Sequence, residues 1–410
     1  MNHKLPLARL AGAALTALSS LPALAANPAL QDLFFAACAN PTGALAARCA
    51  ETTDALGDLS GDSETSLNPS QTLSANQTSL RSALGNAEDA RGRYEGMPAG
   101  EGVRIEMGRF SLLASYGHTW EERDRVQDAD NERGFEADTD SGAVGFDYRL
   151  SETSVLGLML SYESMSLDFD GNNPGVNFTP ASSAGSIDSD NLGVTAFASI
   201  GFDGGGYLDL SAGYRSGDTQ YKRFSVFQES TRTLPQTNSV TEGKADTTEL
   251  WASANLGWQI PLEAWNIGVY GGFTCSSSEV DAYREQDRSG TGLAMAFAGA
   301  DQDSFIGTLG VRAQRALSTR SGVLLPYVRI DYSHEFKDDP LSLRTRYLLD
   351  ADGNTLRLAS DKPDTDFFIA ALGLSAVLPN GWMPFIDLSY WGAYEDLDRV
   401  RLQAGLRKEL

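Results

Sequence analysis

The stretch Asp398-Arg-Val-Arg-Leu-Gln-Ala-Gly-Leu-Arg-Lys-Glu-Leu410 alternates apolar and polar residues up to its last position. From Val400 onward, one set of alternate positions is apolar except for Lys408, and the other set is mostly polar or charged. Successive side chains of a β-strand point to opposite faces, so this pattern predicts a strand with one apolar and one polar face. We expect it to be paired on both edges, as in a closed barrel, because an unpaired edge invites association.

The same alternation recurs upstream and predicts twelve strands. Many of them have about fifteen residues, whereas strands of globular sheets usually have ~3–10. This length argues against a soluble antiparallel sandwich, whose half-buried strands also alternate. The expected strands are 104–120, 134–150, 154–169, 186–203, 206–222, 244–261, 264–280, 300–317, 322–337, 363–378, 382–396 and 398–410.

The connections between these strands alternate in length. Short turns at one rim and long polar loops at the other are typical of outer-membrane barrels, with the long loops extracellular. The predicted fold class is therefore all-β, a 12-stranded antiparallel transmembrane β-barrel. The short connections are 151–153, 203–206, 261–263, 318–322 and 379–381, and the long ones are 121–133, 170–185, 223–243, 281–299 and 338–362.

The first 25 residues are predicted to be a secretory signal peptide. Lys4 and Arg9 precede an apolar stretch from Leu10 to Leu21, and Ala23-Leu-Ala25 offers a cleavage site. No later apolar stretch reaches the ~18–20 residues of a membrane-spanning helix. The formal net charge of -23 argues against binding nucleic acid, whose affinity comes mainly from basic contacts to phosphate.

The region before the barrel has helical composition. Residues 28–57 predict two short helices joined by a turn at Asn40-Pro-Thr-Gly43. Cys38 and Cys49 pair in the oxidising compartment that an exported chain meets; the alternative is two reduced cysteines on helices. Residues 70–93 predict a helix that is polar on nearly every face, which suits the lumen of a barrel better than a core. A disordered linker is the alternative for this segment.

Inward positions of the predicted strands carry charges of both signs. Such charges either hold a plug helix in register or set ion preference in an open pore, and the sequence leaves both uses open. The candidate lumen-lining charges are Arg109, Arg149, Glu163, Asp209, Arg215, Glu249, Arg312, Arg329, Asp387, Arg399 and Arg401.

A catalytic site is not expected. After the signal peptide the only histidines are His118 and His334, both near the long-loop rim, where a rim enzyme would place its base. His334 has acidic and hydroxyl neighbours, but such neighbours are common on an acidic loop, and His118 shares the outward parity of Tyr116. Asp350-Ala-Asp-Gly-Asn354 begins like a calcium loop but lacks its later ligands, so we expect a hairpin tip. We predict no cofactor and no metal.

Residues from about 70 to 410 resemble the translocator domain of autotransporters (type V secretion). The resemblance depends on the signal peptide, the polar lumen helix and the barrel that runs to the last residue. It implies a monomeric barrel in the outer membrane of a Gram-negative bacterium, inserted among its lipids by periplasmic chaperones and the barrel-assembly machinery. Leu406 and Leu410 would belong to the C-terminal assembly signal, with Leu410 in place of the terminal aromatic residue of the family.

The resemblance also implies a division of the chain. Residues 1–25 are the signal peptide, 26–69 a very short passenger, 70–100 the lumen helix and linker, and 101–410 the barrel. The helix contains no Asn-Asn dipeptide, so we expect the passenger to stay attached. The expected function is translocation or display of this segment through the lumen. The alternative is a plugged, porin-like small-solute channel.

Overall fold

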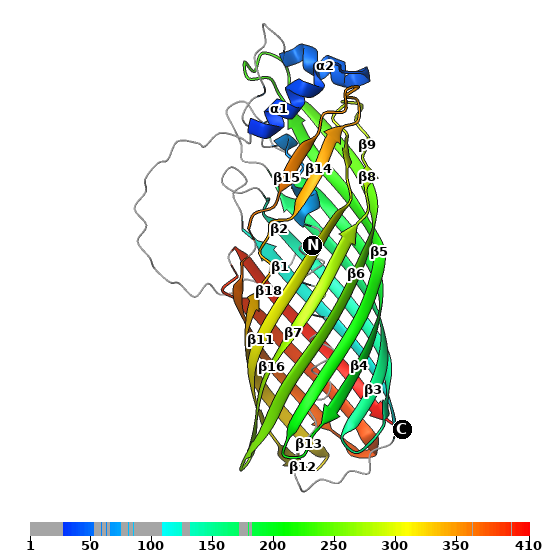
Figure 1. The fold of residues 1–410 in the computed structure, drawn as a ribbon, viewed down its shortest axis with the longest axis vertical. Helices are drawn as coiled ribbons and strands as arrows, with labels where there is room; N and C mark the ends of the chain where they lie inside the picture. Colours follow the sequence, from blue (N-terminus) through cyan, green and yellow to red (C-terminus); the bar gives the residue numbers. More distant parts are fainter. Residues whose placement is uncertain are drawn as a thin grey trace, which may run out of the picture.

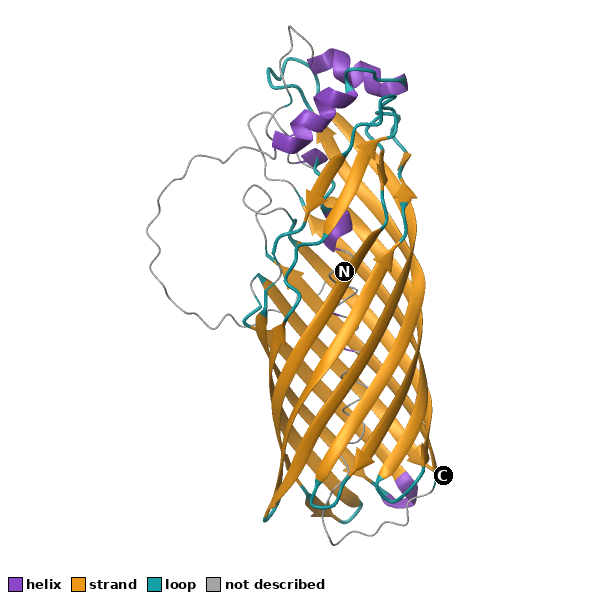
Figure 2. Ribbon diagram, in the orientation of Figure 1, coloured by secondary structure: helices purple, strands orange, loops and turns teal. Residues whose placement is uncertain are grey.

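The computed structural model describes residues 28–52, 59, 63, 66–74, 81, 85, 109–124, 132–171, 179, 183–362, 364–394 and 396–410. The predicted signal peptide and most of the predicted lumen helix lie outside these residues. Figure 1 shows a tall barrel of tilted strands, with the C-terminus at one end and α1, α2, β14 and β15 at the other. Figure 2 shows how strongly strands predominate over helices.

A closed barrel of twelve long antiparallel strands confirms the predicted fold class. The sheet closes because β18 pairs with β1 and β13 pairs with β11. In chain order the barrel strands are β1 (Phe110–Arg123), β2 (Phe135–Arg149), β3 (Ser154–Asp170), β4 (Ser183–Gly201), β5 (Gly206–Phe227), β6 (Thr237–Leu262), β7 (Trp265–Val280), β11 (Ala300–Arg315), β13 (Gly322–Glu335), β16 (Asp366–Val377), β17 (Trp382–Gly392) and β18 (Leu397–Glu409).

The last strand is paired on both edges, as its alternation predicts. On one side β18 pairs with β17, where Lys408 lies opposite Trp382. On the other side it pairs with β1, where Glu409 lies opposite Ser111. The terminal Leu410 continues the ladder by donating its backbone N–H to the Phe110 carbonyl at 2.9 Å.

An apolar band surrounds the outside of the barrel. On β6 it runs from Leu250, 57% exposed, to Ile260, 44% exposed. Ten residues of strand rise about 33 Å, which is about 25 Å along the axis at the usual tilt of ~40° and matches the hydrocarbon height of outer-membrane barrels. Aromatic side chains at both limits of the band, such as Tyr148 near one and Tyr116 near the other, fit interfacial girdles.

Several strands extend beyond their predicted ends on the long-loop side. β5 and β6 have 22 and 26 residues, so the loop predicted at 223–243 shrinks to 228–236. β1 likewise continues through Glu121 to Arg123, which the prediction assigned to a loop. Beyond the membrane the outer face of a strand meets water and carries polar side chains such as Lys222 and Lys244, so the apolar outer positions end there and the sequence resembles a loop.

Two of the predicted long loops form a second sheet, which the sequence analysis missed. Its order is β15 (Leu356–Ala359), β14 (Ser342–Tyr347), β10 (Met295–Phe297) and β8 (Tyr283–Arg284). Asp350 and Gly353 lie in the turn between β14 and β15, which confirms a hairpin tip there. Shorter elements are β9 (Gln286–Asp287), β12 (Leu317–Thr319) and the 3-10 turn η1 (Pro379–Gly381).

Inward-facing aromatic rings lie over glycines of the neighbouring strand. A Cβ atom added at Gly213 would lie 2.0 Å from the Trp251 ring, and one at Gly373 would lie 2.2 Å from the Tyr327 ring. In every case the aromatic residue and the glycine are direct cross-strand partners, so their contact fixes the register of the two strands. The six pairs are Phe197 with Gly157, Tyr207 with Gly257, Trp251 with Gly213, Tyr270 with Gly310, Tyr327 with Gly373 and Phe385 with Gly405.

A glycine substitution tests these pairs. Gly213→Ala should destabilise the barrel by about 1–3 kcal/mol, because the Trp251 ring or the strand must move. Gly142→Ala is the matched control, since a Cβ atom there meets no atom within 4 Å. The measurement is the temperature at which the folded barrel loses its compact migration in gel electrophoresis. Equal midpoints for the two variants would show that the ring does not hold the register.

The band also predicts unequal effects of charge on the two faces. Leu158→Lys on the outer face of β3 should cost about 2–4 kcal/mol if it lies near the bilayer midplane. Ser161→Lys on the inner face of the same strand should cost far less. Denaturant unfolding in lipid vesicles measures both, and equal losses would contradict the assignment of faces.

Candidate functional site: the lumen and the surface cap

Most of the predicted lumen charges are buried or half-buried on the inner face. Arg109 is the exception, because it precedes β1 at the short-turn rim and is exposed there. Arg149, at the same rim, is half-buried, and its Nη2 lies 3.4 Å from Glu409 Oε1. The buried members of the set are Asp209, Arg215, Glu249, Arg312, Arg329 and Arg399, and the half-buried ones are Arg149, Glu163, Asp387 and Arg401.

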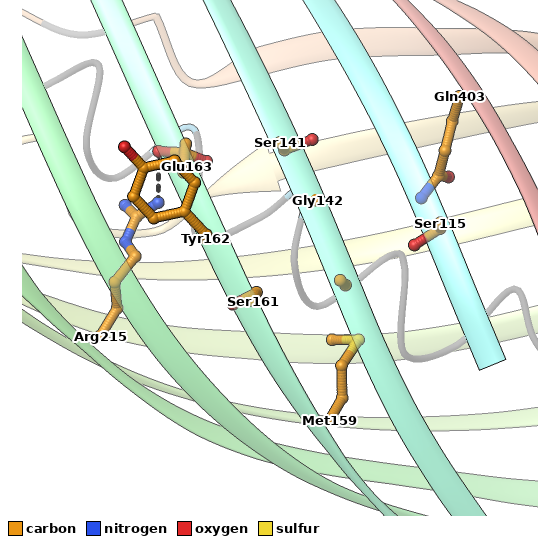
Figure 3. Close-up of a pocket in the computed structure, with 10 residues that line it drawn as sticks. Ser115, Ser141, Gly142, Met159, Ser161, Tyr162, Glu163, Arg215 and Gln403 are labelled. Atoms are coloured by element: carbon orange, nitrogen blue, oxygen red, sulfur yellow. Dashed lines mark hydrogen bonds and ion pairs between the residues drawn. The ribbon is translucent and has the colours of Figure 1, made fainter. Parts of the chain in front are cut away.

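Arg215 is the centre of one inward ion cluster. Its guanidinium group on β5 donates to Glu163 on β3 and to Glu249 on β6. Figure 3 shows Arg215 and Glu163 beside a small cavity that also reaches Ser115 and Gln403. Breaking a buried pair leaves an uncompensated charge, so the three residues tie these strands together.

A second cluster holds the segment that precedes the barrel. Arg81 donates to Glu121 on β1, and Arg399 on β18 donates to the Arg81 carbonyl at 3.2 Å. Two residues further along β18, Arg401 donates to the Gly85 carbonyl at 3.5 Å. Because β18 runs from the long-loop end to the short-turn end, Gly85 lies nearer the short-turn end than Arg81 does.

A third cluster joins the strands that close the barrel, near the short-turn rim. The guanidinium group of Arg407 on β18 binds both oxygens of Asp147 on β2, at 2.9 and 3.2 Å. The same group donates to Ser111 on β1 at 2.9 Å. The cluster therefore spans three strands across the β1–β18 seam.

Aromatic side chains of the lumen also contact the inward charged groups. Arg312 lies 3.7 Å from the centre of the Tyr327 ring, and Tyr327 donates to Asp387 at 2.6 Å. Tyr270 donates to Asp331, a buried carboxylate that the sequence analysis did not select. Glu121, Asp147 and Arg407 were missed as well, although each shares the inward parity of residues that were selected.

The N-terminal helices lie at the long-loop end of the barrel. α1 (Pro28–Ala37) and α2 (Gly43–Thr52) are joined by the predicted turn. Cys38 and Cys49 form a disulfide with their Cα atoms 5.4 Å apart. None of the described helices is long and apolar enough to cross a membrane.

The two helices pack against the second sheet and form with it a surface cap. Phe34 is fully buried, with its ring 5.5 Å from that of Phe227 and 6.1 Å from that of Tyr347. The turn between the helices also binds the turn between β14 and β15, since the backbone N–H of Thr42 donates to the Leu349 carbonyl at 2.8 Å. Burial raises the pKa of the Tyr347 hydroxyl, which therefore stays neutral.

One hydrophobic core joins the surface cap to the upper barrel wall. α1 and α2 supply Leu30, Leu33, Phe34, Ala37, Leu45 and Cys49; the second sheet and its flanks supply Tyr283, Leu293, Met295, Phe297, Leu341, Leu343, Tyr347, Leu356 and Leu358. The upper barrel adds Phe135, Leu167, Phe169, Ile187, Tyr221 and Phe227. Neither the helices nor the loops could bury these side chains alone.

The two histidines form similar contacts on the outside of the barrel. His118 Nδ1 lies 2.8 Å from Asp140 Oδ1, and His334 Nδ1 lies 2.9 Å from Asp366 Oδ1. His118 also packs its ring edge-on against Trp120. Across the described ranges, no cluster of three or more histidine, cysteine or carboxylate side chains is arranged to hold a metal ion.

A closed barrel with an apolar outer band and a charged lumen defines the class of protein, an outer-membrane β-barrel. The chain belongs to the autotransporter β-domain family, because the family model described as "Autotransporter beta-domain" matches residues 115–389. This confirms the predicted family. Barrels of this family lie in the Gram-negative outer membrane, where this one has its long loops outside.

Solved structures agree on the fold. The translocator domain of the autotransporter NalP from Neisseria meningitidis is similar with a TM-score of 0.60 and 14% identity, over 82% of this chain and 98% of that chain. The β domain of the Bordetella autotransporter BrkA is similar with a TM-score of 0.50 and 16% identity, over 74% of this chain and 100% of that chain.

A curated relative carries an enzyme's name. Lipase 1 of Photorhabdus luminescens is 26% identical over 257 residues, which cover 60% of this chain and 34% of the relative, so the chain spans about a third of the relative's length. Because β1 begins at Phe110, an alignment of 257 residues must extend into the barrel. The relative's name therefore assigns no hydrolytic site to this chain.

Removing a buried side chain from the core of the surface cap should loosen the cap locally. Phe34→Ala should destabilise the packing of the cap by about 3–5 kcal/mol, as for other buried phenylalanines. Asp32→Ala on the exposed side of α1 is the matched control. Digestion of intact cells by an external protease measures the change, with faster cleavage of the Phe34 variant expected. Equal rates would contradict the packing of α1 on the loops.

Proposed function

We propose that the barrel displays its own N-terminal helical segment at the cell surface, where this segment remains attached as part of the surface cap. The segment comprises about residues 26–69, and residues 70–100 connect it through the lumen to the barrel of residues 101–410. The single observation that carries the proposal is that α1 and α2 lie at the long-loop end while the chain enters β1 at the short-turn end.

Contacts along the lumen support this path. Leu59 forms a bridge with Glu229 near the long-loop end, and Thr72 bonds Tyr283 at 2.7 Å. Arg81 and Gly85 then contact inward arginines of β18 further down. These residues succeed one another from the outer end toward the periplasmic end, as a segment that crosses the lumen requires.

The same contacts favour display over a small-solute channel. Glu121 and Arg399 bind Arg81 of the connecting residues, so these lumen charges hold the connection in register. The core of the surface cap lies over the outer mouth, and opening a solute path there would expose it to water. A channel would need both sets of contacts to break.

We infer no catalytic step for the chain. His118 and His334 face outward and each contacts an aromatic ring, which suits the membrane interface. Hydrolysis of a lipid ester by the purified chain, lost in a His118→Ala variant, would contradict this.

The proposed C-terminal assembly signal is accessible from the membrane. Leu406 and Leu410 lie exposed on the outer face of β18, where an assembly factor in the outer membrane can reach them.

Site-directed labelling of whole cells tests the display. In a Cys275→Ser background, Asp32→Cys places a thiol on the exposed side of α1. Arg320→Cys places the control thiol in the short turn after β12. A membrane-impermeant maleimide should label the Asp32 variant on intact cells and the Arg320 variant only after the outer membrane is permeabilised.

The opposite outcome has a definite meaning. If Asp32→Cys reacts only after permeabilisation, the N-terminal segment lies in the periplasm, and a plugged channel replaces the proposed display. If Arg320→Cys reacts on intact cells, the barrel has the reverse orientation.

A further inference from the structure

The second sheet has two unlike faces. Its inner face carries the buried rings of Tyr283, Phe297 and Tyr347 and packs against α1. Its outer face faces solvent and carries four arginines, which we call the arginine face. Its members are Arg284, Arg344, Arg346 and Arg357, of which all but the half-buried Arg346 are exposed.

Strand register places the four arginines side by side. Arg344 on β14 lies directly opposite Arg357 on β15. Arg346 lies opposite Ala296 on β10, which in turn lies opposite Arg284 on β8. Neighbouring strands are about 5 Å apart, so the arginine face is about 15 Å wide. The residue between Arg284 and Arg346 is an alanine, which leaves room between their long side chains.

No carboxylate of the described chain forms an ion pair with this face. Arg357 donates to the Ser342 hydroxyl at 3.0 Å, and none of the four arginines forms an ion pair with another described residue. Like charges directly opposite on a sheet are destabilising. Four clustered arginines are therefore costly unless an external anion binds there, and they stand out in a chain of net charge -23.

We propose that the arginine face binds a sulfated linear polysaccharide outside the cell, which goes beyond the display of the N-terminal segment. A guanidinium group offers a planar fork of donors that matches the oxygens of a sulfate or carboxylate. Arginines on adjacent strands can bind successive anionic groups of one chain. Figure 1 places β14 and β15 at the outer end of the barrel, where such a polymer has access.

Two other anionic partners fit less well. Single-stranded nucleic acid is held by stacking its bases on aromatic rings, and the rings of this sheet lie on its buried face. The lipid surface would have to approach past Glu279 and Asp301, which are exposed on adjoining ends of β7 and β11. These carboxylates repel anionic head groups.

The experiment measures binding of heparin oligosaccharides to the purified full chain in detergent. The variants are Arg344→Gln/Arg357→Gln and, on the other strands, Arg284→Gln/Arg346→Gln. Arg320→Gln in the short turn is the matched control, because it removes an exposed arginine at the opposite end. Each double variant should bind about tenfold or more weakly, the control should bind as the parent does, and salt should weaken the parent.

Several outcomes would overturn the proposal. These are no binding by the parent chain, equal binding by the parent and both double variants, and equal losses in the Arg320 control. Tighter binding of a nucleic acid of matched length, or binding of lipopolysaccharide vesicles alone, would assign the face to another partner. Self-association that both double variants abolish would assign it to a second copy of the chain. The assay needs no cells, so it can fail while the labelling result stands.

Discussion

The closed hydrogen-bond ladder is the constraint on which the rest of the structure depends. A bilayer offers no water to unpaired backbone groups, so a sheet can cross it only when no edge remains. The pairing of β18 with β1 removes the last edge. Arg407 then joins β18 to β2 across the seam through Asp147, which adds an ionic link where the ladder closes.

Closure creates a second problem, because the inner faces of twelve strands enclose polar groups away from bulk water. The barrel resolves it in two ways. Aromatic rings lie over glycines, which leave room for them because they lack a Cβ atom, and fill part of the lumen. Charges of opposite sign pair with one another, as Arg215 does, or with the chain that passes through, as Arg399 does with Arg81.

Sequence periodicity predicted the strands within the membrane because the bilayer imposes the alternation there. Above the membrane that constraint ends, and the extensions of β5 and β6 looked like loops. The second sheet was missed because its strands have two to six residues and its core depends on α1, whose partners lie far along the chain. The Thr42 hydroxyl bonds the Leu349 carbonyl 307 residues away, which no local pattern reveals.

The surface cap has a thermodynamic consequence for the position of the N-terminal segment. Each fully buried side chain such as Leu30, Phe34 or Leu45 contributes about 1.5–3 kcal/mol relative to exposure. This stabilisation exists only when the helices lie at the long-loop end, because Phe227 and Tyr347, against which Phe34 packs, lie at that end. Packing with the loops therefore favours the outer position over any position within the lumen, and it favours retention over release of the segment.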